Sequence, residues 1–158
     1  GEFDQYKEVI VPTVKFVTND DVVAAGENIL SLYGFKNKPS LRDDVKINEE
    51  IQKIFYSDQY VGVILKNTNS KFPYRIQVYD LNGNKKMEKE IKLEYDNVSF
   101  SGDNVLMYDD MNCQIISFDG VQKFKVTFNG AVNAIIPIDG SRTFLIMTKS
   151  KIQKVKLK

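Results

Sequence analysis

The sequence contains no histidine and only one cysteine, Cys113, and this composition excludes much of enzyme chemistry. Without histidine the chain cannot build a Ser-His-Asp triad, a Cys-His pair or a histidine-based metal site. With one cysteine it cannot form an intrachain disulfide or a Cys-x-x-Cys pair. Cys113 lies in the short apolar run MNCQIISF, where a free thiol is usually a small packed residue. We therefore expect Cys113 to be buried and inert.

An excess of charge of either sign is also missing, since 22 basic residues oppose 21 acidic ones and the net charge is +1. Such a chain has no long-range field to attract a polyanion, so we expect no nucleic acid partner. No run approaches the length of about eighteen apolar residues that a membrane span needs, so we expect no membrane insertion by this segment. The chain opens with Gly1 rather than methionine, and we expect it to be part of a longer parent.

Two kinds of ligand loop are missing as well. The glycines are dispersed along the chain, so no glycine-rich phosphate loop exists. The stretch DLNGN at residues 80–84 resembles the start of a calcium loop, but Lys85 and Ile91 stand where the EF-hand pattern needs glycine and glutamate. A hairpin turn is the better interpretation. We expect no catalytic, cofactor-binding or metal-binding residues and no cofactor.

What the sequence does contain is a repeat. Four segments share one order of features: an apolar piece, a polar turn, a central apolar strand, another turn and an alternating strand. They recur about every forty residues, which is the length of a propeller blade. We place them roughly at residues 12–47, 48–93, 94–128 and 129–158, within a single domain that spans residues 1–158. Their central strands contain Val23, Val61, Val63, Leu106, Phe144 and Ile146, which we expect to be among the most buried residues.

Within the repeats, apolar and polar residues alternate with the period of a half-buried strand. Phe124 and Val126 alternate with lysine and threonine, and the same pattern occurs near residues 75–78 and 154–158. The pairs Asn82-Gly83, Asp119-Gly120 and Asp139-Gly140 lie between such runs and predict tight turns.

One window allows another interpretation. In the stretch INEEIQKIF, apolar residues Ile47, Ile51, Ile54 and Phe55 have helical spacing, so a short helix near residues 48–55 is an alternative. We prefer the end of one repeat near Ile47 and the start of the next near Ile51.

The predicted fold class is therefore all-β and β-propeller-like, with about four blades of three to four antiparallel strands. An irregular sandwich or barrel is the alternative, because its strands also recur at short intervals. Recurrence of the whole unit favours blades.

Several segments also resemble a known family. They are YVGVILKN, YRIQVYDLNGNKKMEKEIKL, CQIISFDGVQKFKVTF and the ending IIPIDGSRTFLIMTKSKIQKVKLK. These resemble the C-terminal half of a family of uncharacterised, membrane-anchored, β-propeller-like proteins of Gram-positive bacteria, a domain of unknown function. The resemblance implies a longer parent with an N-terminal anchor and a propeller on the extracellular face of the membrane. It implies no catalytic residue.

Two residue sets could carry chemistry but have simpler explanations. The acidic pairs point to opposite faces if they lie in strands, and we interpret them as solvated turn residues. They are Asp20-Asp21, Asp43-Asp44, Glu49-Glu50 and Asp109-Asp110. The tyrosines could line a carbohydrate surface, but half-buried positions in blades are commoner. They are Tyr6, Tyr33, Tyr56, Tyr60, Tyr74, Tyr79, Tyr95 and Tyr108.

Three functions are compatible with these patterns. We prefer a non-enzymatic protein-interaction or scaffold module at the bacterial cell surface, with an unknown protein partner. The alternative is a domain that binds carbohydrate or peptidoglycan fragments, which requires a concave aromatic cluster with polar groups. The third is a hydrolase with carboxylates from different blades. Four blades either close on themselves or form an open arc, and we expect an arc that dimerises through its terminal blades.

Overall fold

The computed structural model describes residues 13–139 and 142–157, and all regular secondary structure in these ranges is β-strand. The strands form four antiparallel sheets, and strands that follow one another in sequence are neighbours in each sheet. The predicted all-β architecture, with sheets of three or four strands, is confirmed.

We call the four sheets blades 1 to 4, in chain order. Blade 1 consists of β1 (Thr13–Phe16), β2 (Asp21–Ala25), β3 (Ile29–Gly34) and β4 (Ser40–Lys46). Blade 2 consists of β5 (Ile51–Tyr56), β6 (Tyr60–Lys66), β7 (Tyr74–Asp80) and β8 (Lys85–Ile91). Blade 3 consists of β9 (Asn97–Ser101), β10 (Asn104–Tyr108), β11 (Asn112–Ser117) and β12 (Gln122–Thr127). Blade 4 consists of β13 (Val132–Asp139), β14 (Thr143–Thr148) and β15 (Ile152–Lys156).

The turns follow the expected chemistry. Gly83 and Gly120 have positive φ angles of 87° and 79°, which glycine adopts without a steric penalty. Asp80 accepts hydrogen bonds from the backbone N–H groups of Asn82 and Asn84, so the DLNGN stretch is a hairpin turn between β7 and β8. The third predicted turn, at Asp139-Gly140, extends to a residue outside those that the structure describes.

The helical alternative near residues 48–55 is wrong, because this window enters β5. Its apolar spacing has a different cause. The register shifts between Ile51, opposite Leu65, and Lys53, opposite Ile64, so Gln52 is an extra residue in a β-bulge. The bulge places Ile51 and Ile54 on the same face of the sheet, although they are three positions apart.

The core consists of three layers, each between two consecutive blades. Blades 1 and 2 enclose a cluster that includes Val23, Leu30, Leu32, Val61, Val63 and Leu65. Blades 2 and 3 enclose Ile76, Val78, Met87, Ile91, Val105, Met107 and Ile116. Blades 3 and 4 enclose Leu106, Cys113, Ile115, Val132, Ile135, Phe144 and Ile146. All six central-strand positions named from the sequence are at most 3% exposed, so this prediction is confirmed.

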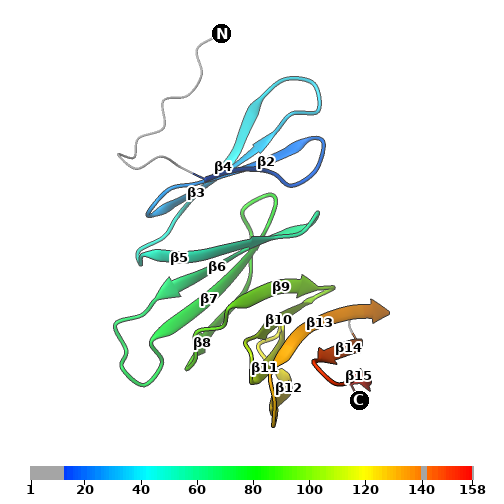
Figure 1. Ribbon diagram of the computed structural model, residues 1–158. Helices are drawn as coiled ribbons and strands as arrows, with labels where there is room; N and C mark the ends of the chain where they lie inside the picture. The colour runs from blue at the N-terminus through cyan, green and yellow to red at the C-terminus, as the bar shows by residue number, and fades with distance from the viewer. Residues whose placement is uncertain (1–12, 140–141, 158) are drawn as a thin grey trace.

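The blades follow one another along an arc, with blade 1 (blue) at one end and blade 4 (orange and red) at the other (Figure 1). The first strands of blades 2 and 3, β5 and β9, lie in contact. Blades 2 and 3 therefore converge at their first strands, the inner side of the arc. Among the described residues, no hydrophobic cluster joins blade 4 to blade 1. The arc is open.

Candidate functional site

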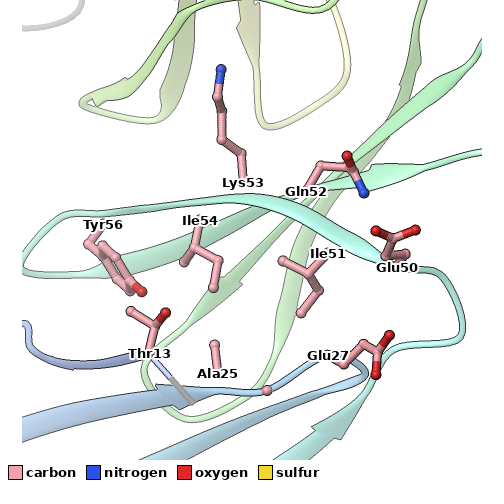
Figure 2. A pocket seen from close by; sticks show the side chains of 10 residues that line it. Thr13, Ala25, Glu27, Glu50, Ile51, Gln52, Lys53, Ile54 and Tyr56 are labelled. Carbon is pink, nitrogen blue, oxygen red and sulfur yellow. The ribbon is translucent and has the colours of Figure 1, made fainter. Parts of the chain in front are cut away.

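A cavity of about 510 Å³ lies between blades 1 and 2, along the inner strand β5. Figure 2 shows β5 above the cavity and blade 1 below it. Blade 1 contributes Thr13, Ala25, Gly26 and Glu27, and the β5 side contributes Glu50, Ile51, Gln52, Lys53, Ile54 and Tyr56.

The bulge in β5 decides which side chains face this cavity. Ile51 and Ile54 point toward blade 1 and form an apolar wall, together with Ala25 on the other side (Figure 2). Lys53 points the opposite way (Figure 2), and its Nζ donates hydrogen bonds to the carbonyl oxygens of Tyr95 and Asp96, at 2.5 and 3.2 Å. Lys53 thus ties blade 2 to the connection that leads into blade 3.

Tyr56 supplies the aromatic ring of the cavity. Its hydroxyl is buried and has no hydrogen-bond partner within the described part of the chain. Burial raises the pKa of the Tyr56 phenol above its ordinary value of 10.0, so it stays a neutral hydroxyl at physiological pH.

Two carboxylates, Glu27 and Glu50, lie toward one end of the cavity (Figure 2). Glu27 belongs to the turn between β2 and β3, and Glu50 directly precedes β5. The cavity therefore combines an apolar wall of isoleucines with two carboxylates toward one end. The two glutamates come from different sides of the cavity, and the hydrolase hypothesis stays a prediction.

A polar network beside the same blade interface is organised around Arg75. Its guanidinium contacts Glu49 at 2.5 Å, Glu90 at 3.7 Å and Glu88 at 3.9 Å. The hydrogen bond from Lys85 to Glu88, 2.6 Å long, helps to lower the pKa of that carboxyl. The network joins the connection after blade 1 to strands β7 and β8, which gives it a structural role.

The interpretation of the acidic pairs as solvated turn residues is partly wrong. Asp43 and Asp44 lie within β4, where Asp44 accepts a 2.5 Å hydrogen bond from the Ser31 hydroxyl. Asp21 is the first residue of β2 and forms a 2.5 Å salt bridge with Arg42. Glu49 binds Arg75, as described above. Short-range sequence patterns contain no signal for these partners, because the partners come from other strands.

The tyrosines are half-buried or buried at every described position, as predicted, and Tyr6 lies outside the described residues. The largest aromatic group consists of Phe55, Tyr60, Phe100 and Phe118 between blades 2 and 3. Their rings pack against one another, with centroids 4.6 to 6.1 Å apart. They form part of the core layer, and no observation supports the carbohydrate-binding alternative.

Cys113 is buried, as predicted, at 1% exposure between blades 3 and 4. Burial, together with the negative charge of Asp109, raises the pKa of its thiol to about 12. Within residues 13–139 and 142–157, no group of three or more acidic residues and cysteines is placed to hold a metal ion. The same ranges contain no helix that could cross a membrane.

The two ends of the arc expose apolar surface. We call the side of blade 1 that faces away from blade 2 its terminal face. There Val14 and Phe16 lie opposite Ala24 and Val22, and they are 59% and 64% exposed. Leu41, opposite Tyr33, continues this face.

The side of blade 4 that faces away from blade 3 is the other terminal face. Ile136 lies opposite Leu145, and Ile152 lies opposite Met147. Ile136 is 43% exposed and Ile152 is 63% exposed. Each terminal face therefore presents large apolar side chains to solvent at a position where an inner blade has a neighbour.

Comparison with solved structures shows a shared fold. The structure of BBS1N in complex with ARL6DN superposes with a TM-score of 0.57 at 12% identity, over 92% of this chain and 50% of that chain. BamB from Moraxella catarrhalis superposes with a TM-score of 0.54 at 15% identity, over 93% of this chain and 42% of that chain. The WD40 β-propeller domain of Doa1 superposes with a TM-score of 0.57 at 14% identity, over 91% of this chain and 50% of that chain. The chain thus has a propeller fold and spans half or less of the length of these structures.

Sequence comparison places the chain in a family. No curated protein matches it. A family model described as "Family of unknown function (DUF5711)" matches residues 1–157, which confirms the resemblance to a propeller-like domain of unknown function. The chain belongs to the family DUF5711.

Proposed function

We propose that this chain is a non-catalytic protein-interaction module whose terminal faces bind further propeller blades. The observation that carries the proposal is a difference between central strands. Residues 61–65 of β6 and 104–107 of β10, which have a blade on both sides, are all buried, and residues 22–25 of β2 in blade 1 are buried as well, so the difference is confined to blade 4. In β14, Leu145 and Met147 are only partly buried.

The sequence of β14 indicates that the partial burial of Leu145 and Met147 leaves a binding face uncovered. Phe144 and Ile146 pack on blade 3. Leu145 and Met147 point to the other side of the sheet, the terminal face, where Ile136 and Ile152 also lie. A sheet with one solvated face normally alternates apolar and polar residues along its strands. Because β14 is apolar on both faces, its sequence suits a strand that is covered on both sides.

A second copy of the chain is the occupant that we propose for these faces. The propeller structures compared above are at least twice as long as their shared part, so an arc of this size leaves about half of such a ring open. Two arcs related by a twofold axis would place each blade 4 against blade 1 of its mate. In a longer parent, blades of the same chain would take the same position.

The cellular setting is a separate proposal. The sequence resemblance supports a parent that is anchored in a bacterial membrane, with the propeller on the extracellular face. Protease treatment of intact cells tests this setting, because an outward-facing propeller is cleaved without lysis. Protection until lysis would contradict it.

Light scattering over a wide range of concentrations tests self-association. We expect a dimer, and we expect Phe16→Glu and Ile152→Glu to be monomeric, because each places a charge in an apolar interface. Val121→Glu is the matched control, since Val121 is an apolar residue of blade 3 that is 50% exposed and lies away from both terminal faces. A wild-type monomer at high concentration, or dimers of Phe16→Glu, would contradict the proposal.

A further inference from the structure

The sequence contains two Asn-Gly pairs, Asn82-Gly83 and Asn129-Gly130. In such a pair the backbone nitrogen of the glycine can attack Cγ of the asparagine, because glycine has no side chain that hinders the approach. The new N–Cγ bond closes an imide ring, the Cγ–Nδ2 bond breaks, and the amide proton of the glycine leaves with the ammonia. Water then opens the imide at either of its carbonyl carbons, which leaves aspartate or isoaspartate. The fold places the two pairs in different surroundings.

The Asn82-Gly83 pair is fixed in the hairpin turn between β7 and β8. Gly83 N donates a hydrogen bond to Asp80 O at 3.1 Å, and Asn82 N donates one to the Asp80 carboxylate at 2.9 Å. The Asp43 side chain of blade 1 lies so close to Gly83 that a Cβ at this glycine would overlap its carboxylate. The attacking nitrogen is therefore bound to an acceptor in a packed turn. This turn must open before the imide can form.

The Asn129-Gly130 pair lies in the connection between β12 and β13, and both of its residues are exposed. No hydrogen bond from any described part of the chain holds either residue. A Cβ at Gly130 would meet no described heavy atom within 4 Å. The backbone nitrogen of Gly130 can therefore approach Cγ of Asn129 without breaking a hydrogen bond or displacing a packed side chain.

The two ends of this connection are held in place. Phe128 N donates a hydrogen bond to Met111 O at 2.6 Å, and Val132 N donates one to Asp110 O at 2.7 Å. Both acceptors belong to the turn between β10 and β11. Conformational freedom is thus confined to residues 129–131, so the imide can form while blades 3 and 4 stay folded.

We propose that Asn129 is a site of spontaneous deamidation in the folded protein, whereas Asn82 is protected from it. Water is the co-reactant. Either product adds a negative charge to the connection between blades 3 and 4, and isoaspartate also lengthens the main chain by one carbon. Because Met111 and Asp110 hold the ends of the connection, the extra carbon weakens the two backbone hydrogen bonds that they accept. The site is internal, so it does not depend on self-association through the terminal faces.

Peptide mapping by mass spectrometry measures the conversion of each asparagine while the folded chain is kept in mildly alkaline buffer. We expect Asn129 to convert at least about tenfold faster than Asn82, because the β7–β8 turn must open before Asn82 reacts. In urea, where both pairs are unfolded, we expect the two rates to become similar. Comparable rates in the folded chain, or conversion of Asn129 only after unfolding, would overturn the proposal.

Gly130→Ala is the matched variant, because its added methyl enters open space. The methyl hinders attack by the backbone nitrogen, so we expect Asn129 to convert at least about tenfold more slowly, with Asn82 unchanged. Conversion at the wild-type rate would show that the imide route is wrong.

Amide hydrogen exchange by NMR tests the effect on the connection. We expect faster exchange at Phe128 and Val132 in the chain that carries isoaspartate than in the unconverted chain, because the hydrogen bonds of these two amides are weakened. Asn129→Asp adds the charge without the extra carbon and is the control, with exchange close to that of wild type. Equal exchange in the isoaspartate chain and in Asn129→Asp would contradict this part of the proposal.

Discussion

The ring of Phe55 lies over Gly62, its partner across the β5–β6 pair, and fills the space that a side chain at position 62 would need. A Cβ on Gly62 would overlap Cζ of Phe55. The ring has little freedom to move, because it is buried and its centroid is 4.6 Å from that of Phe100 in blade 3. An aromatic ring across the strand compensates for the missing side chain of a glycine in a central strand.

We expect Gly62→Ala to lower the free energy of unfolding by about 1–3 kcal/mol, because the added methyl displaces Phe55 from a packed layer. Urea unfolding measures this change. Gly130→Ala is the control, since a Cβ at Gly130 would meet no described heavy atom within 4 Å, and we expect a change within about 0.5 kcal/mol. Equal effects of the two substitutions would show that Phe55 does not require the glycine.

Replacing Arg75 tests the polar network beside blade 1. Arg75→Met leaves Glu49, Glu88 and Glu90 close together without their shared cation, and we expect a loss of about 1–3 kcal/mol in unfolding free energy. Lys85→Met removes a more exposed partner of Glu88, and its expected cost is about 0.5 kcal/mol. High salt should reduce the difference, since it screens the repulsion between the carboxylates. A smaller effect of Arg75→Met than of Lys85→Met would contradict this role.

Asp80 makes the stability of the β7–β8 turn depend on pH. Desolvation acts to raise its pKa, but hydrogen bonds from Asn84, Lys86 and Asn82 outweigh this effect and lower the pKa from 3.8 to about 2. The ionised form therefore stabilises the fold above pH 3.8, and this contribution is lost as the pH falls toward 2. We expect wild type to lose more stability than Asp80→Asn between neutral pH and pH 2, in urea titrations at both values. Parallel losses would mean that Asp80 does not contribute.

The thiol of Cys113 should react slowly in the folded protein. It is buried, and its pKa of about 12 keeps it protonated at the pH of ordinary labelling experiments. We expect a thiol reagent to label the native chain far more slowly than the chain unfolded in urea. Equal rates would show that the layer between blades 3 and 4 opens readily.

The sequence predicts the local structure of this protein well, because local structure depends on neighbouring residues. Alternation identifies strands such as β12, where Phe124 and Val126 interrupt a polar run. Asn82-Gly83 and Asp119-Gly120 mark turns, because glycine accepts the positive φ that these turns require. The recurrence of this unit about every forty residues indicates four blades, which the four sheets confirm.

The sequence could not predict the contacts between blades, and the candidate sites depend on them. The bulge at Gln52 directs Ile51 and Ile54 into the cavity, whereas Lys53 points toward blade 3. In the sequence, the only trace of this bulge is the helical spacing of the apolar residues. In the sequence, Asp21 and Glu49 look like members of solvated acidic pairs. In the structure, Asp21 forms a salt bridge with Arg42, and Glu49 forms one with Arg75. Each of these partners is distant in sequence, and a periodic pattern carries no information about distant partners.

By itself, the sequence determined that this chain is all-β, repeated and apolar on both faces of its central strands, because side-chain period and turn residues are local properties. The same alternation marks the apolar side chains that a neighbouring blade can bury. Only the tertiary structure decided which of these side chains a neighbouring blade does bury. Among the described residues the arc stays open, so Phe16 and Ile152 are exposed at its two ends. Burial depends on the position of the next blade, and that position is set by packing between whole sheets.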